Sequence, residues 1–377
     1  MTVVELSQLR TPCVLVDRRR VDRNLDRMQA AANARGLRLR PHAKTHKSVE
    51  LARRQIAGGA AGICCAKLGE AEVFAEAGIE DIRLPYPLNP VNAERVIELL
   101  DRTRLSFIVD HEQVARGWSE AMRRAGREVD VLVKVDVGFH RCGIDGEAPG
   151  AADFVARVAA LPGLRLRGLL SHAGHGYGAA SDAEMHAIAA AEATTLRRLA
   201  AEVRARGVDV EEISVGATPT ARFSLHEDGL TEIRPGNYIY FDRTQVALGA
   251  AGWDDCALTV LARVVARPAA DRLVLDSGSK TLTNDLARGF SPVPGYGAVL
   301  QVIDGEQAPD PALLVERLSE EHATVRVTDG SPLEPGDLVR IVPNHSCVVS
   351  NLVDSAWLVE GKAVVERLEI SARGRIT

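Results

Sequence analysis

A lysine placed among histidines is the feature of this chain that points most directly to chemistry. The segment 40–47 reads RPHAKTHK and follows the alternating apolar run 37–39. A lysine that a strand end holds in a polar pocket can act as a nucleophile toward aldehydes. Most lysines instead lie in solvated loops, so support for Lys44 has to come from the rest of the chain.

Two further segments carry glycines beside hydroxyl or amide groups. Gly216 and Thr218 lie in one of them, and Gly236 and Asn237 lie in the other. Glycine lets backbone amides approach an anion closely, so both segments could hold a phosphate. A glycine after a strand is also a common turn residue, which makes each segment weak support when taken alone.

Other polar side chains follow the apolar runs 129–135 and 164–170. The guanidinium of Arg141 could face the nitrogen of an aromatic ring, or it could pair with an acid at the rim. His172 could act as an acid or a base, and Tyr177 could orient or protonate a substrate; a structural role is the alternative for each. A lysine, an arginine and a phosphate cradle that lie together at the ends of neighbouring strands suggest pyridoxal 5′-phosphate.

A possible metal site lies in the segment 343–347, which reads PNHSC. Residues two apart in an extended segment point the same way, so His345 and Cys347 could bind one ion. The alternative is a core cysteine beside a surface histidine.

The elements that must position these residues alternate regularly. Short apolar runs predict strands at 13–16, 37–40, 62–66, 82–85, 105–109, 129–135, 164–170, 212–215 and 231–240. Apolar residues spaced by three and four predict helices between them, at 19–34, 70–77, 91–100, 113–124, 151–160 and 182–205. This alternation predicts an α/β fold, a TIM-like (β/α)8 barrel over residues 12–248, with the reactive segments at the carboxyl ends of its strands.

The pattern changes after about residue 256. Runs at 258–265, 272–275, 323–327, 338–342 and 356–359 are separated by short turns rich in proline and glycine. We therefore expect a C-terminal, mostly antiparallel β domain over residues 249–377, joined by residues 1–11, which carries the metal site.

Composition excludes several classes of protein. The 377 residues are 46% hydrophobic and 26% charged, with a net charge of −5, so no basic face is expected for nucleic acid. No apolar run approaches the roughly 20 residues that span a bilayer, and the start lacks a signal-peptide pattern. The six scattered cysteines do not suggest a disulfide framework. We expect a cytoplasmic protein that acts on a small molecule.

The segment 40–47 resembles the cofactor-lysine segment of fold-type III pyridoxal-phosphate enzymes. From about residue 11 to residue 374, the chain resembles the D-threonine aldolase and D-serine dehydratase family, whose barrel is like that of alanine racemase. The resemblance implies that Lys44 bears the cofactor and that Arg141 faces its pyridine nitrogen. The other implied cofactor contacts are Tyr177, Gly216, Thr218, Gly236, Asn237 and Tyr238.

The resemblance also strengthens the metal site, because members carry His-x-Cys or His-x-Asp at this place to hold a divalent ion. An imidazole with a thiolate favours zinc, with manganese or magnesium as alternatives. The fold implies a homodimer.

Three reactions remain open at this stage. A pyridine nitrogen opposite an arginine stays unprotonated and makes a weak electron sink, which a Lewis-acidic ion on the substrate's β-hydroxyl would offset. We favour dehydration of D-serine, D-threonine or 3-hydroxy-D-aspartate to a keto acid and ammonia, because segments 171–177 and 214–220 and the His345–Cys347 pair look like the dehydratase branch. Retro-aldol cleavage to glycine and an aldehyde is the alternative, and amino-acid racemisation without a metal is the second alternative.

Overall fold

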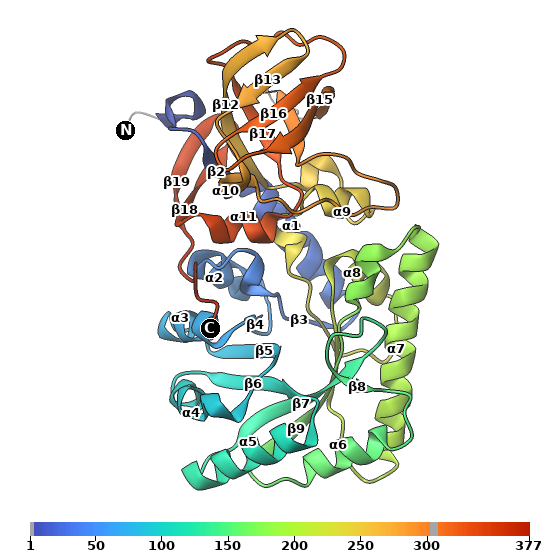
Figure 1. Ribbon diagram of the computed structural model, residues 1–377. Coiled ribbons are helices and arrows are strands. Elements are labelled where there is room, and N and C mark those ends of the chain that lie inside the picture. The colour runs from blue at the N-terminus through green and yellow to red at the C-terminus, as the bar shows by residue number, and fades with distance from the viewer. Residues whose placement is uncertain (1–3, 302–307) are drawn as a thin grey trace.

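Eight parallel strands form the lower part of the molecule in Figure 1 and close into a barrel. The computed structural model describes residues 4–301 and 308–377. The first and last strands of the path meet through a parallel bridge between His42 and Cys64, whose N–H donates to the carbonyl of Pro41 (2.7 Å). The order around the barrel is β3 (Arg38–Leu39), β11 (Glu232–Ile233), β10 (Glu212–Val215), β9 (Leu164–Leu170), β7 (Val129–Asp136), β6 (Arg104–Val109), β5 (Asp81–Pro87) and β4 (Ile63–Cys64). The predicted parallel barrel is confirmed.

The barrel strands are buried on both faces, as strand β7 shows. Val131 and Val133 belong to the large core that the helices share, whereas Leu132 belongs to a small separate cluster with Ile108 and Leu170. Successive side chains of a strand point to opposite faces, so Leu132 faces the barrel interior. Lys134, two residues further on, lies on the same face.

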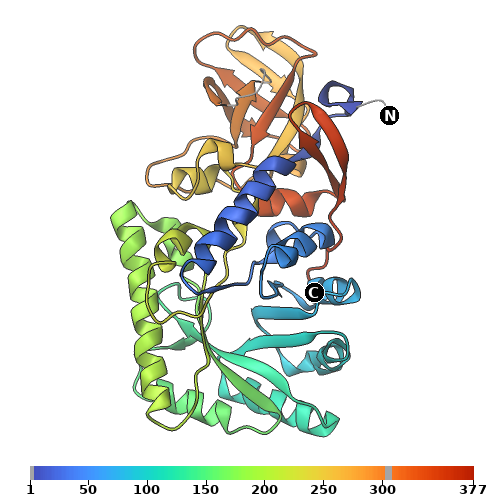
Figure 2. The same cartoon turned by 180° about the vertical axis from the view of Figure 1, so that it is seen from behind.

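Helices surround the barrel on the outside, and Figure 2 shows α1 crossing the back of the molecule from the second domain toward the barrel. Within the described ranges, no helix is long and apolar enough to cross a membrane. The helices of the barrel half are α1 (Arg18–Asn33), α2 (Val49–Ala57), α3 (Leu68–Glu76), α4 (Ala93–Leu100), α5 (Glu112–Ala125), α6 (Ala151–Ala159), α7 (Asp182–Arg204) and α8 (Thr218–Ser224). Helix α9 (Arg243–Ala247) lies beside the second domain in Figure 1, where the N–H of Arg243 donates to the carbonyl of Pro343 (3.1 Å).

The second domain is one ten-stranded sheet, which lies at the top of Figure 1. Its strands pair antiparallel except for β18 with β2, and the additional pairing of β12 with β17 closes six of them into a small barrel. Its strands are β1 (Val4–Glu5), β2 (Cys13–Asp17), β12 (Leu258–Ala269), β13 (Arg272–Leu275), β14 (Ala298–Gln301), β15 (Pro309–Leu318), β16 (Ala323–Val327), β17 (Leu338–Val342), β18 (Ser355–Glu360) and β19 (Ala363–Glu369). Two short helices, α10 (Ser279–Leu282) and α11 (Ser346–Leu352), complete it.

Two details differ from the sequence analysis. Strand β2, which we expected in the barrel, pairs with β12 and β18 in the second domain, because its apolar residues find their partners there. The strand expected at 231–240 spans only Glu232–Ile233, and a 3₁₀ turn follows at Asn237–Ile239. The exact division of the domains at residues 248 and 249 stays a prediction.

Charged side chains fill the barrel interior below the small apolar cluster. Glu232, fully buried, accepts hydrogen bonds from Arg40 (2.8 Å) and Arg83 (2.5 Å), and Arg83 also donates to Glu212 (2.8 Å). Burial raises the pKa of Glu232, but the two arginines outweigh it and hold the pKa at about 2. Arg40 also donates to Asp81 (2.5 Å), so the first residue of strand β5 belongs to the same network.

Substitution of Glu232 by glutamine is expected to destabilise the protein by about 3 to 5 kcal/mol, because it leaves two buried arginines without their shared carboxylate. Urea or thermal unfolding followed by circular dichroism measures the effect. The matched control is Glu120→Gln on the exposed pair with Arg124 in α5, where the loss is expected to stay near about 0.5 kcal/mol. Equal losses in the two variants would contradict the interpretation.

The same variant carries a pH signature. The folded-state pKa of Glu232, about 2, lies below its ordinary value of 4.5, so its stabilising contribution is complete above the ordinary value and is lost as pH falls toward 2. The difference in stability between the wild type and Glu232→Gln is therefore expected to shrink as the pH is lowered through this window.

Candidate active site

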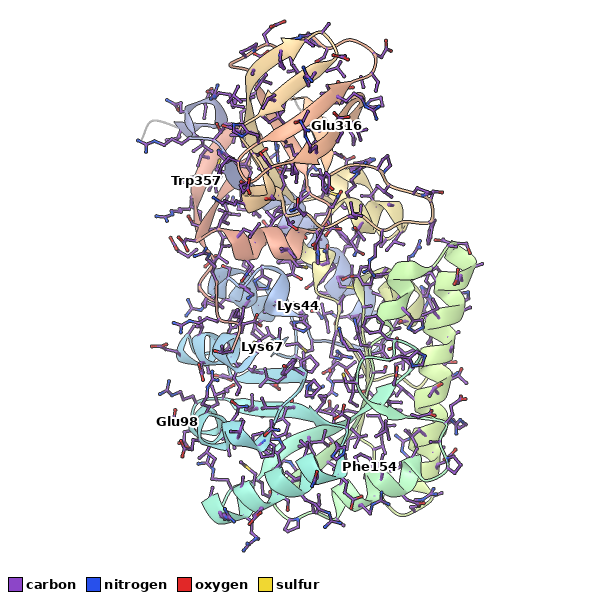
Figure 3. The ribbon with its side chains drawn as sticks, viewed as in Figure 1. Lys44, Lys67, Glu98, Phe154, Glu316 and Trp357 are labelled. Atoms are coloured by element: carbon purple, nitrogen blue, oxygen red, sulfur yellow. The ribbon has the colours of Figure 1, made fainter. Side chains whose placement is uncertain are left out.

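A cavity at the barrel mouth brings together most of the residues that the sequence analysis selected. Figure 3 labels Lys44 near the centre of the molecule, where the barrel meets the second domain. An inner cavity and a wider outer cavity share several lining residues, among them Lys44, Arg141, His172, Tyr177 and His345. The inner cavity is also lined by His42, Thr45, Lys134, Gly216, Thr218, Arg234, Gly236, Asn237 and Cys347. Tyr238 is the only candidate residue that lines neither.

Lys44 lies in a 3₁₀ turn (Ala43–Thr45) just beyond strand β3. The ring of His42 begins the turn, since its Nδ1 accepts the N–H of Lys44 (3.4 Å). The lysine side chain is exposed to both cavities, whereas its neighbour Thr45 is fully buried. The turn therefore presents an accessible amine on a rigid support.

The two glycine segments form a tight cradle beside this amine. A Cβ added to Gly236 would lie 2.9 Å from the hydroxyl oxygen of Thr45, and one added to Gly216 would lie 2.9 Å from the carbonyl oxygen of Arg234. Neither position has room for a side chain. The hydroxyl of Thr218 accepts the N–H of Asn237 (3.0 Å), which leaves its own proton free to donate to an anion.

Two of the candidate phosphate contacts point elsewhere. The amide of Asn237 donates to Asp242 (2.6 Å) and approaches the sulfur of Cys347 (3.6 Å). The hydroxyl of Tyr238 is buried and accepts a hydrogen bond from Gln55 (3.1 Å). The side chain of Tyr238 is therefore not available to the cradle, and Asn237 connects the cradle to the His345–Cys347 pair.

His172 is held as a neutral ring with one free nitrogen. Burial, together with the positive charges of Lys134 and Lys44, lowers its pKa well below the ordinary value. Nδ1 contacts the carbonyl of Gly216, and a carbonyl can only accept, so Nδ1 carries the proton and Nε2 keeps its lone pair. Tyr177 lies nearby, with a hydroxyl that accepts from Gln245 (3.2 Å) and a pKa that burial raises.

Arg141 makes no salt bridge with any residue that the structure describes, so the rim ion pair considered above does not form. Its guanidinium carbon lies 4.8 Å from the ring centre of Phe139. This stacking leaves the guanidinium edge available to a ligand, since Arg141 lines both cavities.

Two buried cations of the inner cavity were not selected from the sequence. Lys134 projects inward from strand β7, and burial together with the charge of Arg234 lowers its pKa to about 7. Arg234 donates to the hydroxyl of Ser214 (2.8 Å) and contacts the carbonyl of Ser171. The lone lysine in the apolar run 129–135 was a usable signal, because alternation places it on the interior face of the strand.

The His345–Cys347 pair lies where strand β17 leads into helix α11. We expected this segment to be extended, and this expectation is wrong. Asp242 accepts the N–H of Ser346 (3.0 Å), and the helix begins directly after His345. The two side chains still meet, and Cys347 also contacts the hydroxyl of Thr45 (3.2 Å) across the domain junction. Nδ1 of His345 donates to Asp285 (2.6 Å), which leaves Nε2 as the nitrogen available to a metal.

The pair favours a thiolate beside an imidazolium, and a divalent metal could replace the proton that lies between them. Burial raises the pKa of the Cys347 thiol, but the hydrogen bond from His345 outweighs it and lowers the pKa below the ordinary value. Burial lowers the pKa of His345, and its contacts with Cys347 and Asp285 and the charge of Asp242 raise it to about 10. Across residues 4–301 and 308–377, no group of three or more His, Cys, Asp or Glu side chains is arranged to hold an ion. Two protein ligands would leave positions open for other molecules.

Comparison with known proteins gives matches over the whole chain. The alanine racemase N-terminal domain model matches residues 16–244, and the model described as "Putative serine dehydratase domain" matches residues 257–359. D-threonine aldolase of Arthrobacter sp. is 34% identical over 98% of this chain and 94% of its own length. D-threo-3-hydroxyaspartate dehydratase of Delftia sp. is 34% identical over 91% of this chain and 92% of its own.

The chain therefore belongs to the D-threonine aldolase and D-serine dehydratase family. A solved cysteine-to-alanine variant of D-threo-3-hydroxyaspartate dehydratase, in the metal-free form, matches with a TM-score of 0.91 and 31% identity over 97% of this chain and 98% of that one. A histidine-to-alanine variant of the same enzyme has also been solved, and the two replaced residues are two positions apart. This family member thus has the spacing of His345 and Cys347.

The residues of the pocket fit the cofactor of this pyridoxal-phosphate-dependent family. The accessible amine of Lys44 suits the aldehyde of the cofactor, and the cradle at Gly216 and Gly236, which has no room for a side chain, suits its phosphate. The unpaired guanidinium of Arg141 suits its ring nitrogen. The donor set of His345 and Cys347, with Asp285 behind the imidazole, fits a divalent metal.

Asp285 was not selected from the sequence, and its replacement tests the metal pair. Asp285→Asn is expected to weaken metal binding about 10- to 100-fold, because the carboxylate orients the imidazole and increases its basicity. Competition with a chromophoric chelator measures the affinity. Asp354→Asn, on an exposed pair with Arg373, is the control; an affinity unchanged in Asp285→Asn would contradict the assigned contact.

Proposed function

We propose that this protein is a pyridoxal-phosphate- and metal-dependent lyase of D-β-hydroxy-α-amino acids, and that it catalyses dehydration to a keto acid and ammonia. The observation that carries the proposal is that Lys44 and the His345–Cys347 pair line one cavity, although they come from different domains. An amine and a metal so arranged can act on neighbouring atoms of one small substrate.

Pyridoxal 5′-phosphate would supply an aldehyde for amines and a conjugated ring that withdraws electrons from the α-carbon. In the proposal, the amine of Lys44 would hold this group, and the same amine, when it is free, would accept the α-proton of the substrate. The Thr218 hydroxyl and the backbone at Gly216, Gly236 and Tyr238 bind the phosphate. The predicted role of the Asn237 side chain at the phosphate is not retained, since its amide donates to Asp242.

Three side chains orient the reacting groups. Arg141 faces the pyridine nitrogen and cannot give up a proton to it. His172, neutral and fixed through Gly216, offers Nε2 as an acceptor. Tyr177 contacts the cofactor or substrate with a hydroxyl that stays protonated at neutral pH, since burial raises its pKa. It can therefore donate a hydrogen bond.

A divalent metal on His345 and Cys347 would act as a Lewis acid toward the β-hydroxyl of the substrate. We propose zinc, because a thiolate with an imidazole suits it better than manganese or magnesium, which prefer oxygen ligands. Asp285 then fixes the imidazole, and Thr45 and Asn237 donate toward the thiolate.

Dehydration is preferred over retro-aldol cleavage because the solved dehydratase has a histidine and a cysteine at the spacing of His345 and Cys347. The equally similar D-threonine aldolase keeps cleavage as the second candidate. A racemase would have no use for the metal pair. The homodimer and the cytoplasmic location remain predictions of the sequence.

Product analysis of the purified protein tests the reaction. With D-serine, D-threonine and D-threo-3-hydroxyaspartate we expect ammonia and a keto acid, and we expect a chelator to remove the activity until zinc is restored. If the products are glycine and an aldehyde, without ammonia, the reaction is retro-aldol cleavage and the proposal of dehydration is wrong. Racemised substrate with activity that survives chelation would overturn the metal-dependent lyase.

Lys44→Ala tests the covalent link separately from turnover. Because Lys44 is the exposed amine of this pocket, whereas Lys134 is buried, the variant is expected to lose the visible absorption band of the lysine-bound group and at least about 1,000-fold in activity. Lys280→Ala, an exposed lysine paired with Glu321, is the control. A band that persists in Lys44→Ala would reject the assignment.

A further inference from the structure

The outer cavity is lined in part by a charged side chain that the proposed reaction does not use. His345 lines both cavities, whereas Asp285, Ala287 and Arg288 line only the outer one. If the β-hydroxyl of the substrate lies at His345, the remaining substituent of the β-carbon faces this outer part. The residues there would contact the part in which β-hydroxy amino acids differ from one another.

The loop that carries Arg288 is anchored beside the metal pair. The N–H of Arg288 donates to the hydroxyl of Thr244 (3.2 Å), and that hydroxyl donates to the carbonyl of Asn344 (2.8 Å). The amide of Asn344 donates in turn to the carbonyl of Asp285 (3.0 Å). Because Asn344 directly precedes His345, the backbone of Arg288 is held at a fixed place relative to the ligands.

Most of the charged side chains of the outer cavity already have partners. Asp285 pairs with His345, and Asp242 accepts from Asn237, Ser346 and Gln245. Lys44 serves the cofactor in the proposed function. Arg288, in contrast, has no acidic side chain within salt-bridge distance anywhere in the described parts of the chain, and the same holds for Arg141.

The two unpaired guanidinium groups differ in the cavities that they line. Arg141 lines the inner cavity as well as the outer one, next to Phe139. Arg288 lines the outer cavity alone, within electrostatic reach of Tyr177: burial raises the pKa of that hydroxyl, and the charge of Arg288 acts in the opposite direction. A cation at this place, in a chain of net charge −5, favours an anionic group beyond the β-carbon.

We infer that Arg288 is a specificity-determining residue that binds a second carboxylate on the β-carbon, so that the preferred substrates are dicarboxylic 3-hydroxy amino acids of the 3-hydroxy-D-aspartate class. A guanidinium binds a carboxylate with two parallel hydrogen bonds, which a hydrogen or a methyl group at that position cannot replace. The inference rests on the proposed function and names the side chain of its substrate.

Steady-state kinetics of the holoenzyme test the inference. In Arg288→Met, the ratio of kcat/KM for D-threo-3-hydroxyaspartate to that for D-serine is expected to fall about 10- to 100-fold, and Arg288→Lys is expected to restore part of it. Arg317→Met removes an exposed arginine of strand β15 and controls for the loss of one positive charge. An unchanged ratio, or an equal loss on both substrates, would overturn the inference, because an arginine that binds the α-carboxylate or supports the fold affects both.

A binding measurement separates this inference from the proposed reaction. Calorimetric titration of the holoenzyme with malate and with lactate compares a dicarboxylate with its monocarboxylate analogue, without turnover. We expect the wild type to bind malate more tightly, and the difference to disappear in Arg288→Met. Absence of any lyase activity together with this result would reject the proposed function but keep the second-carboxylate site; equal affinity of the wild type for both acids would reject the site.

Discussion

The shared carboxylate of Glu232 is the interaction on which the active-site geometry depends. It joins Arg40 of the β3 end to Arg83 of β5, and it accepts the hydroxyl of Ser214 (2.7 Å), which in turn accepts a hydrogen bond from Arg234. Arg40, Ser214 and Arg234 each precede by a few residues a position proposed to hold the cofactor, at Lys44, Gly216 and Gly236. A buried ion network is a weak source of net stability, and here it fixes the relative positions of strand ends.

A second set of polar contacts joins the barrel mouth to the other domain. Asp242 accepts from Asn237, which follows the last barrel strand, and from Ser346, which follows His345. Thr45 contacts Cys347 directly, one residue after the candidate cofactor lysine. The His345–Cys347 pair and Lys44 therefore come from different domains, and the same few hydrogen bonds hold the segments that carry them, so one substrate could contact both at once.

The barrel, the second domain and most of the residues that line the pocket could be predicted from the sequence. Strand and helix periods are local signals, and the polar segments that line the pocket follow strand ends. It failed where structure depends on distant partners. Asp285 lies in an irregular loop 60 residues before His345, and nothing near it in the sequence marks it as a partner. Strand β2 has an ordinary apolar pattern that does not reveal which sheet it joins, and the start of helix α11 at Ser346 depends on Asp242, more than 100 residues earlier.

The pairing of β2 has a consequence for how the chain is made. Val14, Leu15 and Val16 are almost fully buried between β12 and β18, which lie more than 240 residues later in the chain. During translation this apolar segment leaves the ribosome before its partner strands β12 and β18 have been synthesised. The strands of the barrel are all synthesised before these partners. The sheet of the second domain can therefore be completed only after the last strands have been synthesised, when β2 pairs with them. A C-terminal fragment that begins after the barrel would lack β2, which is an inner strand of this sheet.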